Sequence, residues 1–155
     1  MDSLKFKPRG RYFEEFVVGQ SLVTAGRTIT ESDVVNFAGV SGDFNQMHVD
    51  AEYAAVGEFG ERVAHGLLVV SIAVGLIVQT GLMEGTVLAF REMDWKFSRA
   101  VLIGDTVRAK IEITKLKSLP RLGGGSINAK VTVLNQQDQA VHRGNMVLLV
   151  RSQPE

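Results

Sequence analysis

The stretch from Gly66 to Leu82 constrains the fold of this chain more than any other segment. Its side chains are apolar almost all round, and only Ser71 and the glycines interrupt them before Gln79. The stretch falls short of the roughly 20 residues that span a bilayer, so no membrane span is expected. Its β-branched residues would suit a strand, but its length favours a helix. A helix that is apolar on most sides is buried on most sides. We therefore predict a central helix at 66–82.

Four segments after this helix have the alternation of half-buried strands. Apolar residues occupy every second position from Val107 to Ile113 and from Ile127 to Val133. The four segments run over 87–97, 107–113, 127–133 and 141–151. Turns are expected at Gly104-Asp105, at Pro120 with Gly123-Gly124-Gly125, and at Gln136-Gln137-Asp138. This pattern predicts long antiparallel strands with short connections. Together with one long apolar helix, it predicts an α+β fold in which the sheet curls around the helix.

The N-terminal half of the chain has a different character. Residues 1–18 are expected to form an irregular lead-in that is held to the body by Tyr12, Phe13 and Phe16. Residues 21–29 combine Thr and Val with polar neighbours and are predicted to form a strand. No linker, repeat or low-complexity tract interrupts the sequence. Its 155 residues therefore predict a single domain over 1–155.

Two short helices are predicted between this strand and the central helix. Thr30 opens a capping box with Asp33, and Gly42 is a typical residue after a helix end. Asp50 is a favourable N-cap for a second helix, which Gly57 ends. The region 30–57 is therefore expected to be a helical overhang that projects from the body and covers a site.

Composition limits the partners and the setting. Apolar residues make up 45% of the chain and charged residues 22%, with 17 basic and 17 acidic side chains. A net charge of zero gives no electrostatic reason to expect nucleic acid or an anionic membrane as a partner. The absence of cysteine excludes disulfides, thiolate nucleophiles and zinc–thiolate sites. The first eleven residues lack the apolar core of a secretory signal, so a cytoplasmic protein is expected.

The loop predicted after Gly42 carries the first candidate site. Asp43, Asn45 and His48 bring a carboxylate, an amide and an imidazole into six residues. A carboxylate and an imidazole that share one water molecule can perform acid–base chemistry on it. Each residue alone has an ordinary structural explanation, since Asp is common in turns, Asn braces loops and His is often buried. Their combination indicates a site.

The pair His65-Gly66 is the second candidate, because it opens the predicted central helix. Backbone N–H groups in the first turn of a helix lack intrahelical partners, and the helix dipole is positive there. A carbonyl oxygen that gains negative charge would be stabilised at such a position. The structural alternative is that His65 caps the helix and Gly66 relieves crowding. The three histidines, His48, His65 and His142, have no metal-ligand spacing, so no metal site is predicted.

Three segments resemble the MaoC-like, (R)-specific enoyl-CoA hydratase family. They are Phe37–His48, Arg62–Leu68, and Phe97–Val101 with Gly104–Val107. The resemblance extends from about Tyr12 to the last strand. The first segment is fairly specific, whereas the Gly-Asp turn of the third is found more widely in hot-dog folds. Gln46 stands where the family usually has proline, and Val74 where some members have serine.

The resemblance implies a hot-dog fold and a homodimer whose sheets join edge to edge, with residues 30–57 over a substrate tunnel at the subunit interface. It implies a lyase of acyl-CoA metabolism that adds water reversibly, in syn fashion, to a trans-2-enoyl-CoA and gives the (R)-3-hydroxyacyl-CoA. By resemblance, Asp43 and His48 are the catalytic dyad, Asn45 positions the water and the dyad, and the Gly66 N–H is the oxyanion donor. His65 supports them. No cofactor is implied, since CoA is part of the substrate.

Two other functions fit the same fold. A hot-dog thioesterase would direct water at the thioester carbon instead of C3, although the spacing of Asp43, Asn45 and His48 favours hydration. A non-catalytic subunit would bind acyl-CoA without turning it over. Fold alone cannot distinguish these functions.

Overall fold

The computed structural model describes residues 9–154, and residues 1–8 and 155 lie outside this description. Its helices are α1 (Glu31–Ser41), α2 (Gln46–Val49), α3 (Ala51–Ala55) and α4 (Gly66–Gln79), with 3-10 turns at Phe13–Glu15 and Pro120–Leu122. Its strands are β1 (Ser21–Val23), β2 (Arg27–Thr28), β3 (Val87–Phe97), β4 (Thr106–Leu119), β5 (Gly124–Leu134) and β6 (Ala140–Arg151). The strand order is β1-β4-β5-β6-β3, and β2 pairs with β4.

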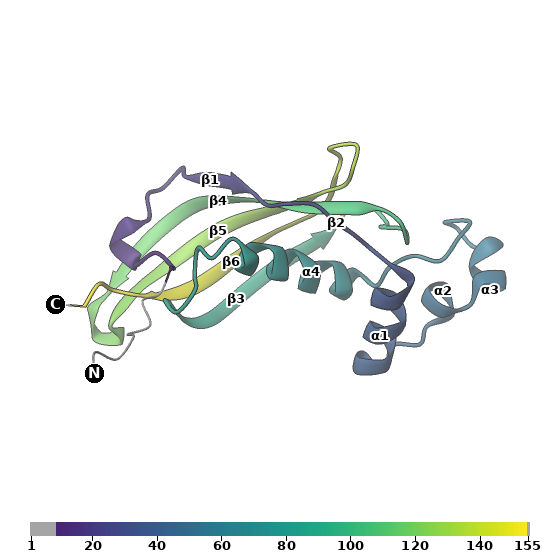
Figure 1. Cartoon of the computed structure of the whole chain (residues 1–155), viewed down its shortest axis with the longest axis horizontal. Helices are drawn as coiled ribbons and strands as arrows, with labels where there is room; N and C mark the ends of the chain where they lie inside the picture. Colours follow the sequence, from purple (N-terminus) through teal and green to yellow (C-terminus); the bar gives the residue numbers. More distant parts are fainter. Residues whose placement is uncertain (1–8, 155) are drawn as a thin grey trace, which may run out of the picture.

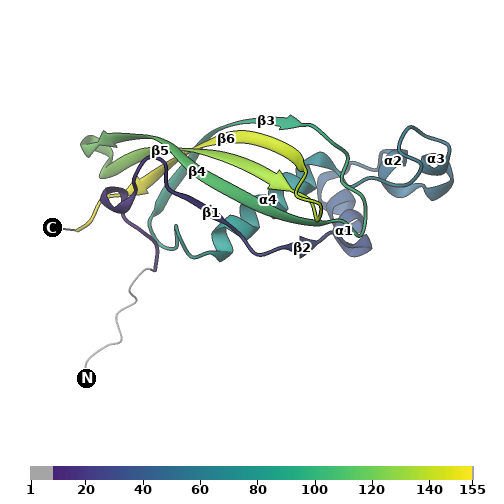
Figure 2. The same cartoon turned by 90° about the horizontal axis from the view of Figure 1, so that it is seen from above.

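The antiparallel sheet curves around α4, and the three short helices extend beyond one end of it (Figures 1 and 2). The alternating residues of β4 and β5 face inward, as Val107 and Val131 show with no exposed surface. Val69 and Ala73 of α4 are equally buried. The apolar faces of sheet and helix thus cover one another, which confirms the predicted α+β fold with a sheet wrapped around one central helix.

Strand β4 continues to Leu119, six residues beyond the predicted end at 113, and three other boundaries also differ from the prediction. Helix α4 ends at Gln79 and not at Leu82, because the Thr80 hydroxyl donates to the Ile77 carbonyl and Gly81 follows with a φ of 75°. The strand predicted over 21–29 is two short strands, β1 and β2. They are separated by residues 24–26, which belong to neither strand, and the Thr24 side chain accepts a hydrogen bond from the Ala109 N–H at 3.0 Å.

The third difference concerns the glycines after Pro120. Gly124 and Gly125 belong to β5 and not to the turn. A Cβ at Gly125 would lie 2.3 Å from two ring atoms of Phe13. The close approach explains how the lead-in is held to the sheet, together with Phe16, which is 4% exposed.

The overhang follows the predicted capping residues. Thr30 and Asp33 form the reciprocal capping box of α1, and Gly42 ends the helix with a φ of 77°. Asp50 caps α3 by accepting from the Tyr53 N–H at 2.9 Å. The loop predicted between them contains an extra one-turn helix, α2, whose N-cap is Asn45. Within residues 9–154, no helix has both the length and the apolar character needed to cross a membrane.

The buried histidine of β6 makes stability depend on pH. His142 is 2% exposed, and burial lowers its pKa to about 4. A histidine in the unfolded chain takes up a proton near pH 6.5, so the unfolded state gains protons between pH 6.5 and 4 while the folded state does not. Full stability is therefore expected above pH 6.5. The free energy of unfolding should fall by up to about 2 kcal/mol on going to pH 5.

Urea unfolding at pH 7.5 and pH 5 measures this loss. The variant His142→Gln has no group that titrates there, so the part of the loss that His142 causes should vanish in it. An equal loss in both proteins would assign the pH dependence to other groups.

Candidate active site

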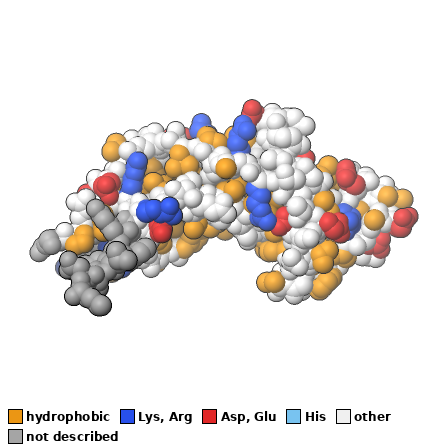
Figure 3. Space-filling model, viewed as in Figure 1, with side chains coloured by type: hydrophobic (Ala, Val, Ile, Leu, Met, Phe, Trp, Pro, Cys, Tyr) orange, Lys and Arg blue, Asp and Glu red, His pale blue; other side chains and the backbone are white. Residues whose placement is uncertain are grey.

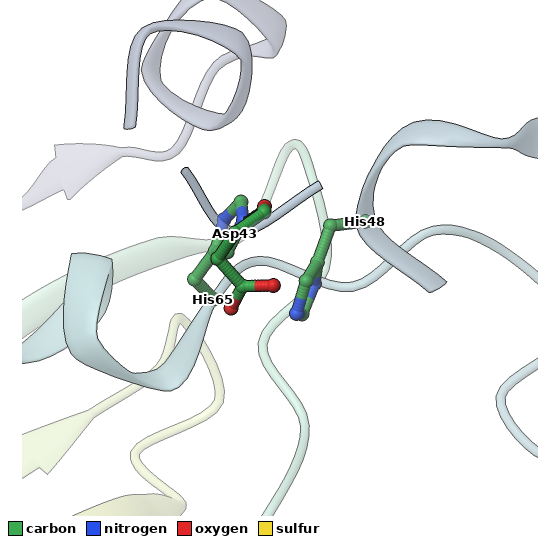
Figure 4. Close-up of side chains that lie close together, drawn as sticks. All are labelled: Asp43, His48 and His65. Carbon is green, nitrogen blue, oxygen red and sulfur yellow. Dashed lines mark hydrogen bonds between the residues drawn. The ribbon is translucent and has the colours of Figure 1, made fainter. Parts of the chain in front are cut away.

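Three candidate side chains from two distant segments meet where the overhang joins the start of α4 (Figure 4). One carboxylate oxygen of Asp43 and one ring nitrogen from each of His48 and His65 lie within 4.8 Å of one another. Figure 4 shows the Asp43 carboxylate directed toward the His48 ring. Both histidines are buried, whereas Asp43 is exposed. The arrangement places a solvent-accessible carboxylate beside an imidazole that is held in place.

The orientation of His48 is set by a backbone carbonyl. Its Nδ1 lies 2.7 Å from the carbonyl oxygen of Val63, and the Val63 N–H donates in turn to the Met47 carbonyl at 3.2 Å. A carbonyl oxygen only accepts hydrogen bonds, so Nδ1 of His48 carries the proton. Nε2 is then left with a free lone pair, which is the atom that can take a proton from water.

Asp43 directly follows Gly42, the C-cap of α1, so its side chain lies just beyond the end of that helix. Its backbone N–H donates to the Ser41 hydroxyl at 3.1 Å, and its Oδ1 accepts from the Asn45 N–H at 3.2 Å. The second contact is the ordinary turn interaction of an aspartate. Oδ2 makes no hydrogen bond to any of residues 9–154. One oxygen therefore shapes the loop while the other is available for chemistry.

Asn45 has a structural role in this arrangement. Its side-chain oxygen accepts from the Met47 N–H at 3.3 Å and so caps α2, the helix that carries His48. Gln46 is the first residue of α2, a position where proline is also favourable because the N–H needs no intrahelical partner. The replacement of the family's proline by Gln46 is thus compatible with the same loop. The positioning of water by Asn45 stays a prediction.

Gly66 is the first residue of α4, and His65 is its N-cap. A Cβ at position 66 would lie 2.7 Å from two ring atoms of Phe97, at the end of β3. Only glycine allows this ring to pack against the helix start. The first N–H groups of α4 have no intrahelical acceptors and point out of the helix end, so the site combines a carboxylate and an imidazole with N–H groups that can donate to an anion.

The cluster of Asp43, His48 and His65 has the residue types of a metal site, but its geometry does not fit one. The two imidazole rings stack with centroids 3.9 Å apart and planes inclined by 28°. A metal ion binds a histidine in the plane of the ring, and a single ion cannot lie in the planes of two rings stacked in this way. The absence of a metal cofactor stays a prediction.

Sequence reasoning missed three contributors to the site. Phe37 packs against His65 with ring centroids 4.9 Å apart, and Phe97 lies against Gly66. Alternation along β3 could have placed Phe97 on the helix side of the sheet, and helical spacing could have placed Phe37 inward. The third contributor, the backbone carbonyl of Val63, cannot be recognised from the sequence, because every residue has such a group.

An apolar cavity of about 550 Å³ lies beyond the middle of α4. It is lined by Arg9, Val74, Ile77, Val78, Gln79, Met83, Glu84, Gly85, Val87, Phe90, Met146 and Leu148. From Gly66 to this cavity, one face of α4 carries Leu67 and Ser71 and then Val74 and Val78, which line the cavity. Leu67 and Val78 are about 60% exposed. At 1.5 Å per residue, Val74 lies about 12 Å along the helix from Gly66. The dyad and the cavity are thus joined by a mainly apolar helix face.

Comparisons of the sequence with a family model and with known proteins indicate the same family. Residues 14–135 match the family described as "MaoC like domain". The chain is 40% identical over 105 residues to the (R)-specific enoyl-CoA hydratase of Rhodospirillum rubrum, which covers 68% of the chain and 71% of that relative. It is also 40% identical over 107 residues to Protein MaoC of Klebsiella aerogenes, covering 69% of the chain but only 32% of that relative.

Solved structures agree in fold. The monoamine oxidase regulatory protein of Archaeoglobus superposes with a TM-score of 0.88 at 34% identity, covering 96% of this chain and all of that one. The unliganded R-hydratase of Pseudomonas aeruginosa gives 0.77 at 31% identity, with coverages of 92% and 86%. A Mycobacterium tuberculosis protein described as a double hotdog fold gives 0.83 at 22% identity, covering 94% of this chain and 46% of that one, and supports the fold alone. The chain therefore belongs to the MaoC-like dehydratase family and has its hot-dog fold.

Proposed function

We propose that this protein is an enoyl-CoA hydratase that adds water reversibly to a trans-2-enoyl-CoA and forms the (R)-3-hydroxyacyl-CoA. The observation that carries the proposal is the Asp43 carboxylate facing the His48 imidazole beside the N-terminus of α4. Relatives named (R)-specific enoyl-CoA hydratase and 3-hydroxybutyryl-CoA dehydratase support this class of reaction. The reaction needs acid–base groups and an oxyanion donor, and both kinds of group are present.

The proposed mechanism uses both the dyad and the start of α4. Water lies between the Asp43 carboxylate and Nε2 of His48, and this dyad takes one proton from it. The water oxygen bonds to C3, and the C2–C3 π electrons move through the thioester to its carbonyl oxygen. The N–H of Gly66 at the positive end of α4 stabilises that oxygen. The proton held by the dyad then goes to C2. Because two coupled groups share the proton, it belongs to the pair and not to one residue.

The acyl group is proposed to be apolar. It would run from Gly66 along the exposed face of α4 toward the cavity that Val74 and Val78 line. Among the residues that the structure describes, Arg9 is the only cation in that lining, and it is paired with Glu84 at 2.6 Å. A second carboxylate on the substrate would have to compete with this ion pair. A panel of enoyl-CoAs should therefore favour straight medium chains over dicarboxylic ones.

We also propose a homodimer joined through β3. This strand is at the edge of the sheet and pairs only with β6 in residues 9–154. Its apolar side chains Val87, Leu88, Phe90, Met93 and Phe97 are each between 37% and 54% exposed. Figure 3 shows apolar side chains along the underside of the body and on the overhang, with a concave outline between them. An exposed apolar edge favours pairing with another strand. Sedimentation equilibrium should give twice the 16.9 kDa chain mass.

Two parallel assays test the proposed function. Hydration removes the absorbance of the conjugated enoyl thioester, whereas thioester hydrolysis releases a thiol. We expect loss of enoyl absorbance without thiol release, and the same rate after dialysis against EDTA. Thiol release would favour the thioesterase alternative. Tight acyl-CoA binding without either signal would favour a non-catalytic subunit.

A further inference from the structure

His65 contacts both members of the proposed dyad. Its Nε2 lies 2.9 Å from the backbone carbonyl oxygen of Asp43. Its ring stacks on that of His48 with centroids 3.9 Å apart. With 2% of its surface exposed, His65 cannot adopt another rotamer without displacing its neighbours. It is a buried polar side chain at the centre of the site for which the mechanism above has no chemical step.

The hydrogen bond to Asp43 determines the tautomer of His65. Since the Asp43 carbonyl only accepts, Nε2 of His65 is the donor and carries the proton. Nδ1 of the neutral ring is then unprotonated, and it is buried without a hydrogen-bond partner among residues 9–154. His48 has the opposite tautomer, with its proton on Nδ1 toward Val63. The two stacked rings are thus oriented separately, each by one backbone carbonyl.

This hydrogen bond also fixes the loop that carries the carboxylate. The other hydrogen bonds of residues 42–45 within the described chain lead to α1, to α2 or to the loop itself. The bond from His65 is the one that connects the Asp43 backbone to the start of α4. Asp43 and Phe44 are both exposed, so burial does not hold this loop in place.

The stack supports the other half of the dyad. Positive charge that reaches His48 while the dyad holds the proton from water has a favourable neighbour in the aromatic ring of His65, with centroids 3.9 Å apart. His65 is also the N-cap of α4, directly before Gly66. His65 therefore fixes the positions of the Asp43 carboxylate, the His48 imidazole and the start of α4 relative to one another.

We propose that His65 is the positioning residue of this site: its Nε2–H holds the Asp43 loop and its ring holds His48, so that both groups face one water molecule in register with Gly66. This inference rests on the proposed hydration. It assigns to His65 no contact with substrate and no proton transfer, which distinguishes it from the dyad. Displacing a catalytic group by about 1 Å can cost about 100-fold in rate.

Two substitutions separate its two contacts. His65→Phe keeps a stacking ring and removes the donor, whereas His65→Gln keeps a donor and removes the ring. With crotonyl-CoA, each should lower kcat by about 10- to 100-fold and change KM by less than about threefold. His142→Phe is the matched control, because His142 is equally buried, its ring packs edge-on against Trp95 and Phe97, and it undergoes the same replacement. It should lower thermal stability without lowering kcat more than about twofold.

A double substitution tests whether His65 acts through the dyad. In an Asp43→Asn background no carboxylate remains to be positioned, so adding His65→Phe should lower the residual rate by less than about twofold. A purely structural residue would lower the rate by the same factor in both backgrounds. Equal factors, or single variants with kcat within about twofold of the native value, would overturn the proposal.

Nitrogen-15 NMR of the imidazoles gives a test that does not depend on activity. We expect the Nε2–H tautomer for His65 and the Nδ1–H tautomer for His48, with each signal assigned by its loss in the corresponding variant. In His65→Phe, the Asp43 and Phe44 amide signals should shift or broaden. An Nδ1–H tautomer at His65 would overturn the inference even if the enzyme is a hydratase. Failure to hydrate any enoyl-CoA would instead overturn the proposed function, and the NMR result would still decide the role of His65.

Discussion

Asp43→Asn and His48→Ala are each expected to lower kcat for enoyl-CoA hydration by at least 100-fold and by up to about 10,000-fold. The first change removes the free carboxylate oxygen but retains an oxygen that can keep the turn to Asn45. The second removes the lone pair of Nε2 that the Val63 carbonyl directs toward the water site. Neither change removes apolar packing from the sheet and α4, so both variants should fold. The measurement is the initial rate of enoyl absorbance loss with purified protein.

Asp50→Asn is the matched control for the aspartate. Asp50 caps α3 in the same overhang, and asparagine is an equally good N-cap. This variant should keep the native rate within about twofold, because N-caps of equal quality differ little in energy. Circular dichroism and sedimentation should show native structure and mass for all three variants. Native turnover by either dyad variant would show that the dyad is assigned wrongly.

Gly66→Ala is expected to lower kcat by about 100-fold, the cost of losing one oxyanion donor in other enzymes. Its methyl group would meet two ring atoms of Phe97 at 2.7 Å, closer than carbon atoms approach in proteins. Phe97 is the last residue of the edge strand β3 and lies outside the buried core, so its ring can be displaced and the chain can still fold. The helix start and its N–H groups would move with respect to the dyad. Steady-state kinetics with crotonyl-CoA measures the effect.

Two further variants isolate the cause. Gly75→Ala lies in the same helix, and beyond its own stretch of helix backbone no described atom lies within 4 Å of the added carbon. It should leave the rate unchanged while stabilising α4 by up to about 1 kcal/mol. Phe97→Ala combined with Gly66→Ala removes the collision and should recover part of the lost rate. If Gly66→Ala were as active as the native protein, the start of α4 would not be the oxyanion site.

Local signals in the sequence predicted most of the fold. The alternation in β4 and β5 shows which face of the sheet is buried, and the apolar run of α4 shows that this helix is buried on most sides. These buried faces determine how the sheet and the helix pack in layers. The capping residues Thr30, Gly42 and Asp50 predicted the helices of the overhang for the same local reason. The errors at Leu82 and Thr24 arose from side-chain hydrogen bonds to backbone, from Thr80 to Ile77 within α4 and between Thr24 and Ala109 of β4, which interrupt a regular element without changing its apolar pattern.

The site was only partly predictable. The spacing of Asp43 and His48 indicated acid–base chemistry, and the helix start at Gly66 indicated anion stabilisation. That the two segments meet depends on tertiary structure. The carbonyls of Val63 and Asp43, which determine the tautomers of His48 and His65, belong to the backbone and have no sequence signature. The stacking of His65 on His48 likewise joins residues 17 positions apart, a distance that no helical or strand period predicts.

The central claim is that one dyad, on one side of the substrate, supplies both the oxygen and the proton of the added water. Hydration of crotonyl-CoA in D₂O, followed by NMR of the product, tests this claim most directly. We predict (R)-3-hydroxybutyryl-CoA with deuterium at C2 on the same face as the new C3 oxygen. Deuterium on the opposite face would contradict this claim, because the two atoms would then come from groups on different sides of the substrate, and an (S) product would contradict the proposed (R) configuration.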